Sequence, residues 1–136
     1  MTIALTSGEP SGIGPDIAII HAQRERAENI QVYADPDVLR ERAKALNLPL
    51  TLKENSTSKA GELSVFPVKS KEKTIPGKLN PDNADYVLSL IKQATHDCLN
   101  NKCNGILTGP INKAVINQAG IKFSGHTEYL AELSNC

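Results

Sequence analysis

The sequence predicts a layered α/β fold with a largely parallel sheet. Two observations carry this prediction: short apolar stretches typical of buried strands alternate with segments of helical periodicity, and loops rich in Gly and Pro follow several of the strands. The chain has 136 residues, of which 40% are hydrophobic and 22% are charged, a balance typical of one globular domain. No internal repeat or long linker divides it.

The first strand and the first helix flank a loop rich in Gly and Pro. Residues 2–6 alternate β-branched and apolar side chains and are expected to form a buried strand, and the loop covers residues 7–14. Pro15 and Asp16 favour a helix start, because Pro has a fixed φ and a carboxylate is stabilised near the positive end of a helix. We expect this helix to run to about Arg26.

A second strand and a second helix follow. Residues 30–34 favour the strand, and Asp35 followed by Pro36 is typical of an N-cap and a first helical residue. The expected apolar stripe of this helix comprises Val38, Leu39, Arg42, Ala45 and Leu46.

The middle of the chain predicts two short strands and a long loop. Residues 50–53 and 63–68 favour strands separated by a polar stretch, and this pair is a candidate for an antiparallel edge of the sheet. Residues 69–79 show no clear period, so we expect an exposed loop there.

The longest helical pattern begins where Asn80 and Pro81 repeat the cap-and-proline start. The residues expected on its buried face are Ala84, Val87, Leu88, Ile91, Ala94, Thr95 and Cys98. Residues 105–108 favour a short strand, and a helix over residues 113–119 is expected to end at Gly120.

The last helix is expected to begin with Thr127 as its N-cap and to run to Cys136. Its pattern reaches the final residue without a clear cap or a polar tail. Natural domains usually close their last helix, so we expect the chain to stop partway through a larger protein.

Composition and charge argue against several classes of function. Fifteen Lys and Arg residues balance fifteen Asp and Glu residues, which removes the electrostatic argument for a nucleic-acid or membrane-surface partner. No apolar run approaches the roughly 18–20 residues of a membrane-spanning helix, and the N-terminus does not resemble a signal peptide. The three Cys residues are odd in number and lack CxxC spacing, so we expect a reducing, cytoplasmic location.

The histidines do not predict a metal site. His21, His96 and His126 are far apart in the sequence, and none has a partner at the spacing of a metal-ligand pair. We therefore expect no metal site within this chain.

Three loops leave the ends of strands, where open α/β sheets bind ligands. The first contains Glu9, Gly12 and Gly14 and opens a helix whose backbone N–H groups suit an anion. Its spacing, Gly-x3-Gly-x-Gly, matches neither the dinucleotide nor the Walker pattern, so a tight turn is an equal alternative. We expect Gly12 to lie where a Cβ cannot enter the turn.

The other two loops carry a Thr beside a cation or a titratable ring. Thr108 and Lys113 together suit a phosphate or a carboxylate, with a solvated helical Lys as the alternative. His126 and Thr127 at a helix start suit an anionic ligand, with a simple helix cap as the alternative.

Four segments of the sequence carry motifs: residues 8–15 (GEPSGIGP), 76–80 (PGKLN), 108–113 (TGPINK) and 123–128 (FSGHTE). Together and in this order they resemble 4-hydroxythreonine-4-phosphate dehydrogenase, the PdxA family of vitamin B6 synthesis. They are similar to its opening GDPAGIGPE segment, its PGKLN element before a long helix, and its T(G/A)PxxK and FxGHTE elements. Glu9 and Ser11 stand where Asp and Ala are frequent in the family.

The resemblance implies a three-layer α/β/α fold like that of isocitrate and isopropylmalate dehydrogenases. Family members are more than twice as long, so residues 1–136 are expected to be the N-terminal part of a dehydrogenase whose remainder is absent. It also implies a homodimer with active sites at the subunit interface. The implied reaction is oxidation of 4-phosphooxy-L-threonine with NAD or NADP, after which the 3-keto acid loses CO2 to give an amino-ketone phosphate for pyridoxine 5′-phosphate synthesis.

The resemblance assigns few roles to this chain. His126 and Thr127 match the family's substrate-binding His-Thr pair, while Thr108, Lys113 and the Glu9, Gly12 and Gly14 loop are expected near the site. The family's divalent metal (Zn, Mg or Co) is expected to be bound by residues outside this chain, which alone is expected to be inactive. A paralogue acting on 4-phospho-erythronate or 4-phospho-threonate, and a non-catalytic module that binds a phosphorylated ligand, are the alternatives.

Overall fold

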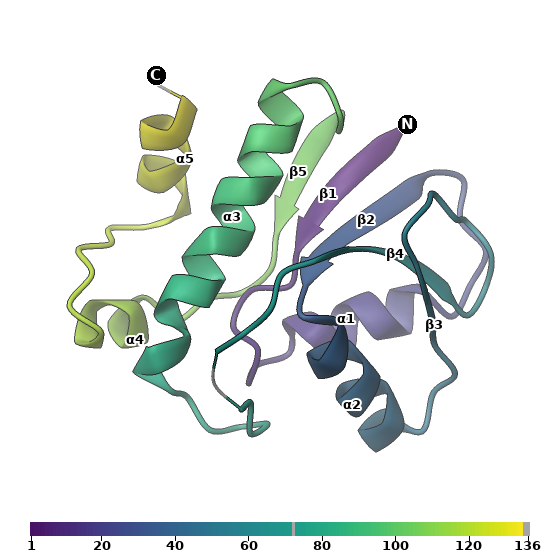
Figure 1. Cartoon of the computed structure of the whole chain (residues 1–136), viewed down its shortest axis with the longest axis horizontal. Coiled ribbons are helices and arrows are strands. Elements are labelled where there is room, and N and C mark those ends of the chain that lie inside the picture. Colours follow the sequence, from purple (N-terminus) through teal and green to yellow (C-terminus); the bar gives the residue numbers. More distant parts are fainter. Residues whose placement is uncertain (72, 135–136) are drawn as a thin grey trace.

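The computed structural model describes residues 1–71 and 73–134 (Figure 1). The five described strands form one sheet in the order β3-β4-β2-β1-β5, and every neighbouring pair is parallel. The strands are β1 (Thr2–Thr6), β2 (Asn29–Ala34), β3 (Thr51–Lys53), β4 (Glu62–Pro67) and β5 (Gly105–Thr108). The predicted α/β class with a parallel sheet is confirmed.

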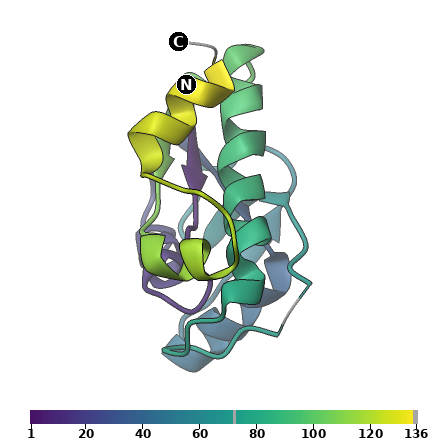
Figure 2. The same ribbon diagram turned by 90° about the vertical axis from the view of Figure 1, so that its left-hand side faces the viewer.

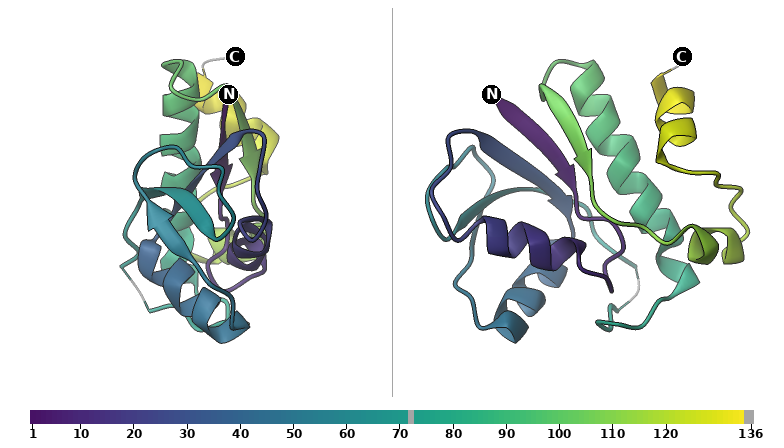
Figure 3. Two further views of the ribbon diagram at one scale, coloured as in Figure 1. Left: turned by 90° about the vertical axis from the view of Figure 1, so that its right-hand side faces the viewer. Right: turned by 180° about the vertical axis from the view of Figure 1, so that it is seen from behind.

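Helices cover both faces of the sheet, which gives the three layers (Figures 2 and 3). The helices are α1 (Gly14–His21), α2 (Pro36–Leu46), the 3-10 turn η1 (Pro81–Asn83), α3 (Ala84–Leu99), α4 (Lys113–Gln118) and α5 (His126–Ser134). α1 and α2 pack on one face, α3 packs on the other, and α5 lies beside α3 (Figure 2).

The alternation of side chains along β2 explains how one strand serves both layers. Successive side chains of a strand point to opposite faces. Val32 and Ala34 join the core under α1 and α2, whereas Tyr33 between them joins the core under α3. The Tyr33 hydroxyl donates a hydrogen bond of 2.6 Å to Asp97 Oδ2, and this buried contact ties β2 to α3.

The first helix ends at His21, so the expectation that it runs to about Arg26 is wrong. Continuing the helix would require the Ala22 carbonyl to accept the Arg26 N–H. That carbonyl instead accepts the N–H of Gly61 at 2.8 Å, and the Arg26 N–H donates to Ser58 O at 2.9 Å. Contacts with a distant segment therefore end the helix.

The expected antiparallel edge is also wrong, because β3 and β4 are parallel, with Thr51 opposite Glu62. Residues 54–61 carry the chain back to the edge where β3 began instead of forming a hairpin turn. Arg26 holds this crossover in place, since its Nη2 donates to Glu62 O at 2.6 Å.

Two details of helix faces and ends differ from the expectation. In α2, Ala45 and Leu46 are exposed, and Ala43 takes their place on the buried face, one turn after Leu39. In α5, Thr127 is not the N-cap, because the helix already includes His126. The residue before the helix is Gly125, whose φ of +149° favours glycine and whose carbonyl accepts the Tyr129 N–H at 3.2 Å.

The remaining expected elements are confirmed within the described residues. Asp35 and Asn80 cap their helix starts through their side chains, and Gly120 follows α4 with a φ of +86°. The expected face of α3 is buried except for half-buried Cys98. Cys136, the expected end of the last helix, lies outside the described residues. None of the described helices has the length and apolar character to cross a membrane.

Candidate functional site

The loops after β1 and β5 meet at the carboxyl edge of the sheet. Because the strands are parallel, all of them end at this edge. β1 has β2 on one side and β5 on the other, so this is the point where the order of the strands reverses, the usual ligand crevice of such folds. Here the Glu9 N–H donates to Pro110 O at 2.8 Å and the Gly109 N–H donates to Thr6 O at 2.7 Å.

Glycines allow these two backbones to approach so closely. A Cβ on Gly8 would lie 2.3 Å from Pro110 O, and one on Gly109 would lie 2.5 Å from Thr6 O. A Cβ on Gly14 would lie 1.8 Å from the carbonyl oxygen of Ser7. No side chain fits at these distances.

The expectation for Gly12 is wrong. A Cβ on Gly12 would meet its nearest atom, Glu9 O, at 3.4 Å, and its φ is not in the left-handed region. The positions where the backbone excludes a side chain are therefore Gly8, Gly14 and Gly109, and not Gly12.

Glu9 closes its own loop. Its side chain is 6% exposed, and Oε1 accepts hydrogen bonds from the Ser11 hydroxyl at 2.9 Å and the Ser11 N–H at 3.3 Å. Ser11 thus supplies two donors to the Glu9 carboxylate.

The segment with the PGKLN pattern also reaches this edge. The Gly77 N–H donates to Ser11 O at 2.8 Å, in the same loop that contacts Pro110. Three of the four motif segments, residues 8–15, 76–80 and 108–113, are therefore brought together.

Arg42 was missed as a site residue by sequence reasoning. It lies in α2 with 7% of its surface exposed, and its guanidinium donates to Pro10 O at 2.7 Å and to Gly12 O at 2.8 Å. The sequence did contain a signal for Arg42, which is its place in the predicted apolar stripe. A charged side chain among buried positions requires polar partners.

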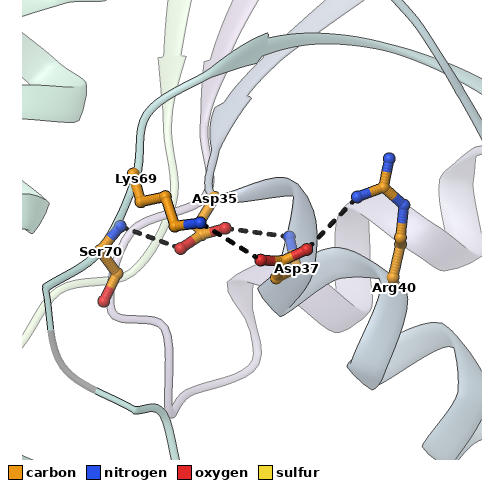
Figure 4. Close-up of polar contacts among 5 residues, drawn as sticks. All are labelled: Asp35, Asp37, Arg40, Lys69 and Ser70. Atoms are coloured by element: carbon orange, nitrogen blue, oxygen red, sulfur yellow. Dashed lines mark hydrogen bonds and ion pairs between the residues drawn. The ribbon is translucent and has the colours of Figure 1, made fainter.

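Asp35 organises the edge after β2 (Figure 4). Its Oδ1 accepts the Asp37 N–H and its Oδ2 accepts the Ser70 N–H, both at 2.9 Å, so one buried carboxylate joins α2 to the segment after β4. The Asp35 N–H donates to the Tyr86 hydroxyl at 2.7 Å, and burial raises the pKa of Tyr86 to about 12. Lys69 lies 3.8 Å from the exposed Asp37 carboxylate.

Thr108 and Lys113 lie on the same side of the molecule with different exposure. Thr108 ends β5 opposite Thr6 and is half-buried. Lys113 is the first residue of α4 and is exposed, while Asn112 caps that helix through the Val115 N–H at 3.0 Å. The position of Lys113 leaves its ammonium group accessible to an anion.

His126 and Thr127 are the first two residues of α5, which packs beside α3. Thr127 is exposed, whereas His126 is half-buried with its ring 6.4 Å from that of Phe123. His126 Nε2 is buried without a hydrogen-bond partner among the described residues, and burial lowers the pKa of the ring. No hydrogen bond, ion pair or ring contact between described residues joins this pair to the loops after β1 and β5.

Within residues 1–71 and 73–134, no group of three His, Cys, Asp or Glu side chains could hold a metal ion. His21 and His96 are exposed near the ends of α1 and α3. The described residues therefore do not fit a divalent metal by themselves.

Comparison with known proteins places the chain in a family. The sequence model of the pyridoxal phosphate biosynthetic protein PdxA matches residues 26–136. Proteins named 4-hydroxythreonine-4-phosphate dehydrogenase from Saccharophagus degradans and Pseudoalteromonas atlantica are 46% and 44% identical over 98% of this chain. These matches span only 41% and 42% of the relatives' length.

A solved structure agrees with the sequence comparisons. The crystal structure of 4-hydroxythreonine-4-phosphate dehydrogenase from Klebsiella pneumoniae superposes with a TM-score of 0.85 and 28% identity, covering 98% of this chain and 44% of that one. With its fold, its motif segments and these relatives taken together, the chain belongs to the PdxA family of pyridoxal phosphate biosynthetic proteins.

Proposed function

We propose that this chain is part of a cytoplasmic dehydrogenase that oxidises 4-phosphooxy-L-threonine in pyridoxine 5′-phosphate synthesis. The observation that carries the proposal is the 46% identity, over 98% of the chain, to a relative named 4-hydroxythreonine-4-phosphate dehydrogenase. In this reaction the carbon that bears the secondary hydroxyl loses a hydride and the hydroxyl oxygen loses a proton. The resulting 3-keto acid then loses CO2 and gives 3-amino-2-oxopropyl phosphate.

His126 and Thr127 are the proposed substrate-binding residues of this chain. A buried polar atom without a partner is unfavourable by about 1–3 kcal/mol, and His126 Nε2 is such an atom among the described residues. A substrate oxygen would supply the missing hydrogen bond. Because burial lowers its pKa, His126 is proposed to act as a neutral imidazole near pH 7.

The carboxyl edge is the second proposed contribution of this chain. The exposed Lys113 ammonium suits a phosphate group, and the Thr108 hydroxyl lies at the end of the neighbouring strand. The Gly8–Gly109 contact and the bonds of Arg42 hold the loop that contains Glu9, Gly12 and Gly14 in one conformation.

The proposed reaction requires a nicotinamide cofactor and a divalent metal ion. When bound, NAD or NADP would accept the hydride, and a divalent ion (Zn, Mg or Co) would stabilise the negative charge on the substrate oxygen. Since no suitable ligand set exists among the described residues, the metal ligands are proposed to lie outside this chain. A homodimer with active sites between its subunits completes the proposal.

Kinetics of the whole protein that contains this chain test the role of His126. We expect His126→Ala to raise KM for 4-phosphooxy-L-threonine and to lower kcat/KM by roughly 10–1000-fold. His96→Ala is the matched control, because His96 is exposed on α3 and its described hydrogen bond joins only Asn100. Unchanged kinetics in His126→Ala, or an equal loss in His96→Ala, would remove His126 from the site. Assays with 4-phospho-erythronate and 4-phospho-threonate test the substrate assignment directly.

A further inference from the structure

Arg42 directs its described hydrogen bonds to one loop and to the helix turn that follows it. Nη1 donates to Gly12 O and to Asp16 Oδ1, both at 2.8 Å, and Nη2 donates to Pro10 O at 2.7 Å. The side chain is 7% exposed. These partners compensate for the burial of its charge.

The backbone carbonyl groups of residues 10–12 all accept hydrogen bonds from Arg42 or from Gly77. Arg42 takes the first and the third, and the Gly77 N–H takes the second, Ser11 O, at 2.8 Å. α2 and the segment around Gly77 therefore fix the orientation of three consecutive peptide groups.

Fixing these carbonyls also fixes the N–H groups, because C=O and N–H point in opposite directions in a trans peptide. The N–H groups of Ser11 and Gly12 turn toward Glu9, whose Oε1 and backbone oxygen accept them at 3.3 Å and 3.0 Å. The conformation of the loop after β1 is thus specified from both sides.

Only a guanidinium group meets all three acceptors in this geometry. Arg42 reaches them through two nitrogens of one planar fork at 2.7–2.8 Å. A lysine ammonium at the same position has one nitrogen and cannot occupy both places. The substitution Arg42→Lys therefore keeps the positive charge and removes the ability to bond Pro10 O, Gly12 O and Asp16 at once.

We propose that Arg42 is a positioning residue of the active site. It holds residues 10–13 so that the loop after β1 meets the loop after β5 in the conformation that the reaction requires. The inference rests on the proposed function, since it assigns Arg42 to the reaction proposed above. Arg42 acts through the loop and not by contact with substrate.

The test compares Arg42→Lys with Arg40→Lys in the whole protein that contains this chain. Arg40 lies on the same helix with an exposed side chain, and its described bond joins only Asp37. We expect Arg42→Lys to lower kcat/KM for 4-phosphooxy-L-threonine by about 10–100-fold. The melting temperature should fall by several degrees, because buried carbonyl oxygens lose a donor, and the variant should still fold. Hydrogen exchange of residues 7–14 should become at least about 10-fold faster in Arg42→Lys only.

Several results would overturn the inference. Unchanged exchange of residues 7–14 would mean that Arg42 does not hold the loop, and faster exchange with unchanged kinetics would mean that the loop does not serve the reaction. Equal loss of protection across β2 and β4 would mean that Arg42 only stabilises the fold. If Arg42→Lys fails to fold, Asp16→Ala, which removes one of the three acceptors, should show the same effects in weaker form. Absence of turnover in the wild type would refute the proposed function, and loop exchange would still decide whether Arg42 holds the loop.

Discussion

Gly14→Ala should be one of the most damaging single substitutions in this chain. The new Cβ would lie 1.8 Å from the carbonyl oxygen of Ser7 and 2.9 Å from its carbon, both backbone atoms at the end of β1. Relief requires a backbone shift of more than about 1 Å, since carbon and oxygen need roughly 3 Å or more. Ser7 cannot move freely, because its N–H donates to Tyr33 O at 3.2 Å within the sheet.

The expected cost of Gly14→Ala is about 3 kcal/mol. Overpacking usually costs about 1–3 kcal/mol and sometimes more, and the upper end applies here because the new Cβ meets backbone atoms at 1.8 Å. Gly14 is the first residue of α1, so the helix propensity of alanine offsets little of this cost. A domain of this size has a total stability of roughly 7–20 kcal/mol, so the protein should fold with its urea midpoint lowered by about 1.5 M.

Urea unfolding of the 136-residue chain, followed by circular dichroism, measures this effect. Gly12→Ala is the matched control, because its Cβ would be 3.4 Å from the nearest atom, and we expect its stability to stay within about 0.5 kcal/mol of wild type. Equal midpoints for Gly14→Ala and wild type, or a larger loss in Gly12→Ala, would mean that the backbone around Ser7 tolerates a side chain at position 14.

Three further predictions concern the polar groups. Asp35→Ala removes the acceptor of two N–H groups and should lower the free energy of unfolding in urea by about 2–3 kcal/mol. The control Asp37→Ala, at an exposed position, should lower it by less than about 0.5 kcal/mol. Equal losses in the two variants would contradict the bridging role of Asp35. Tyr86 should ionise with a pKa of about 12, which phenolate absorbance measures. The free energy of unfolding that its neutral form contributes is therefore fully present below pH 10 and is lost as the pH rises toward 12. Ionisation of Tyr86 near pH 10 in the folded chain would contradict this. Burial lowers the pKa of His126, so the unfolded state binds more protons and stability should fall as the pH drops from about 7 to 5, less steeply in His126→Gln; identical slopes would contradict it.

Local sequence signals predicted the elements whose ends are set by their own residues. Asp35 with Pro36 and Asn80 with Pro81 specify helix starts through a side-chain acceptor and a fixed φ, and both are observed. The alternation of side chains in residues 2–6 likewise specifies β1 locally, because it depends only on the two-residue period of a strand.

Features set by distant residues were not predictable from local patterns. The first helix ends early where the Gly61 N–H takes the Ala22 carbonyl. The segment that leads from β3 to its parallel neighbour β4 is bonded to Arg26, which lies far from it in the sequence. Thr127 was expected to be the N-cap, but the conformation of Gly125 allows the helix to begin at His126, two residues earlier than that cap implies.

The candidate site divides in the same way. The glycine-rich loop at the end of β1 was predictable from its place between a strand and a helix, whereas the particular glycine that excludes a side chain was not, because that depends on where Ser7 and Pro110 lie. Arg42 followed the helical period of its apolar neighbours, so only the structure shows that it contacts the loop after β1.

The proposed dehydrogenase reaction releases two products that can be measured together. The whole protein that contains this chain should be incubated with 4-phosphooxy-L-threonine, NAD or NADP, and Zn2+, Mg2+ or Co2+, while reduced cofactor and CO2 are followed together. We expect both to form in equal amounts and omission of the divalent ion to stop the formation of both. Absence of reduced cofactor under every combination would contradict the assignment of this chain to a 4-phosphooxy-L-threonine dehydrogenase.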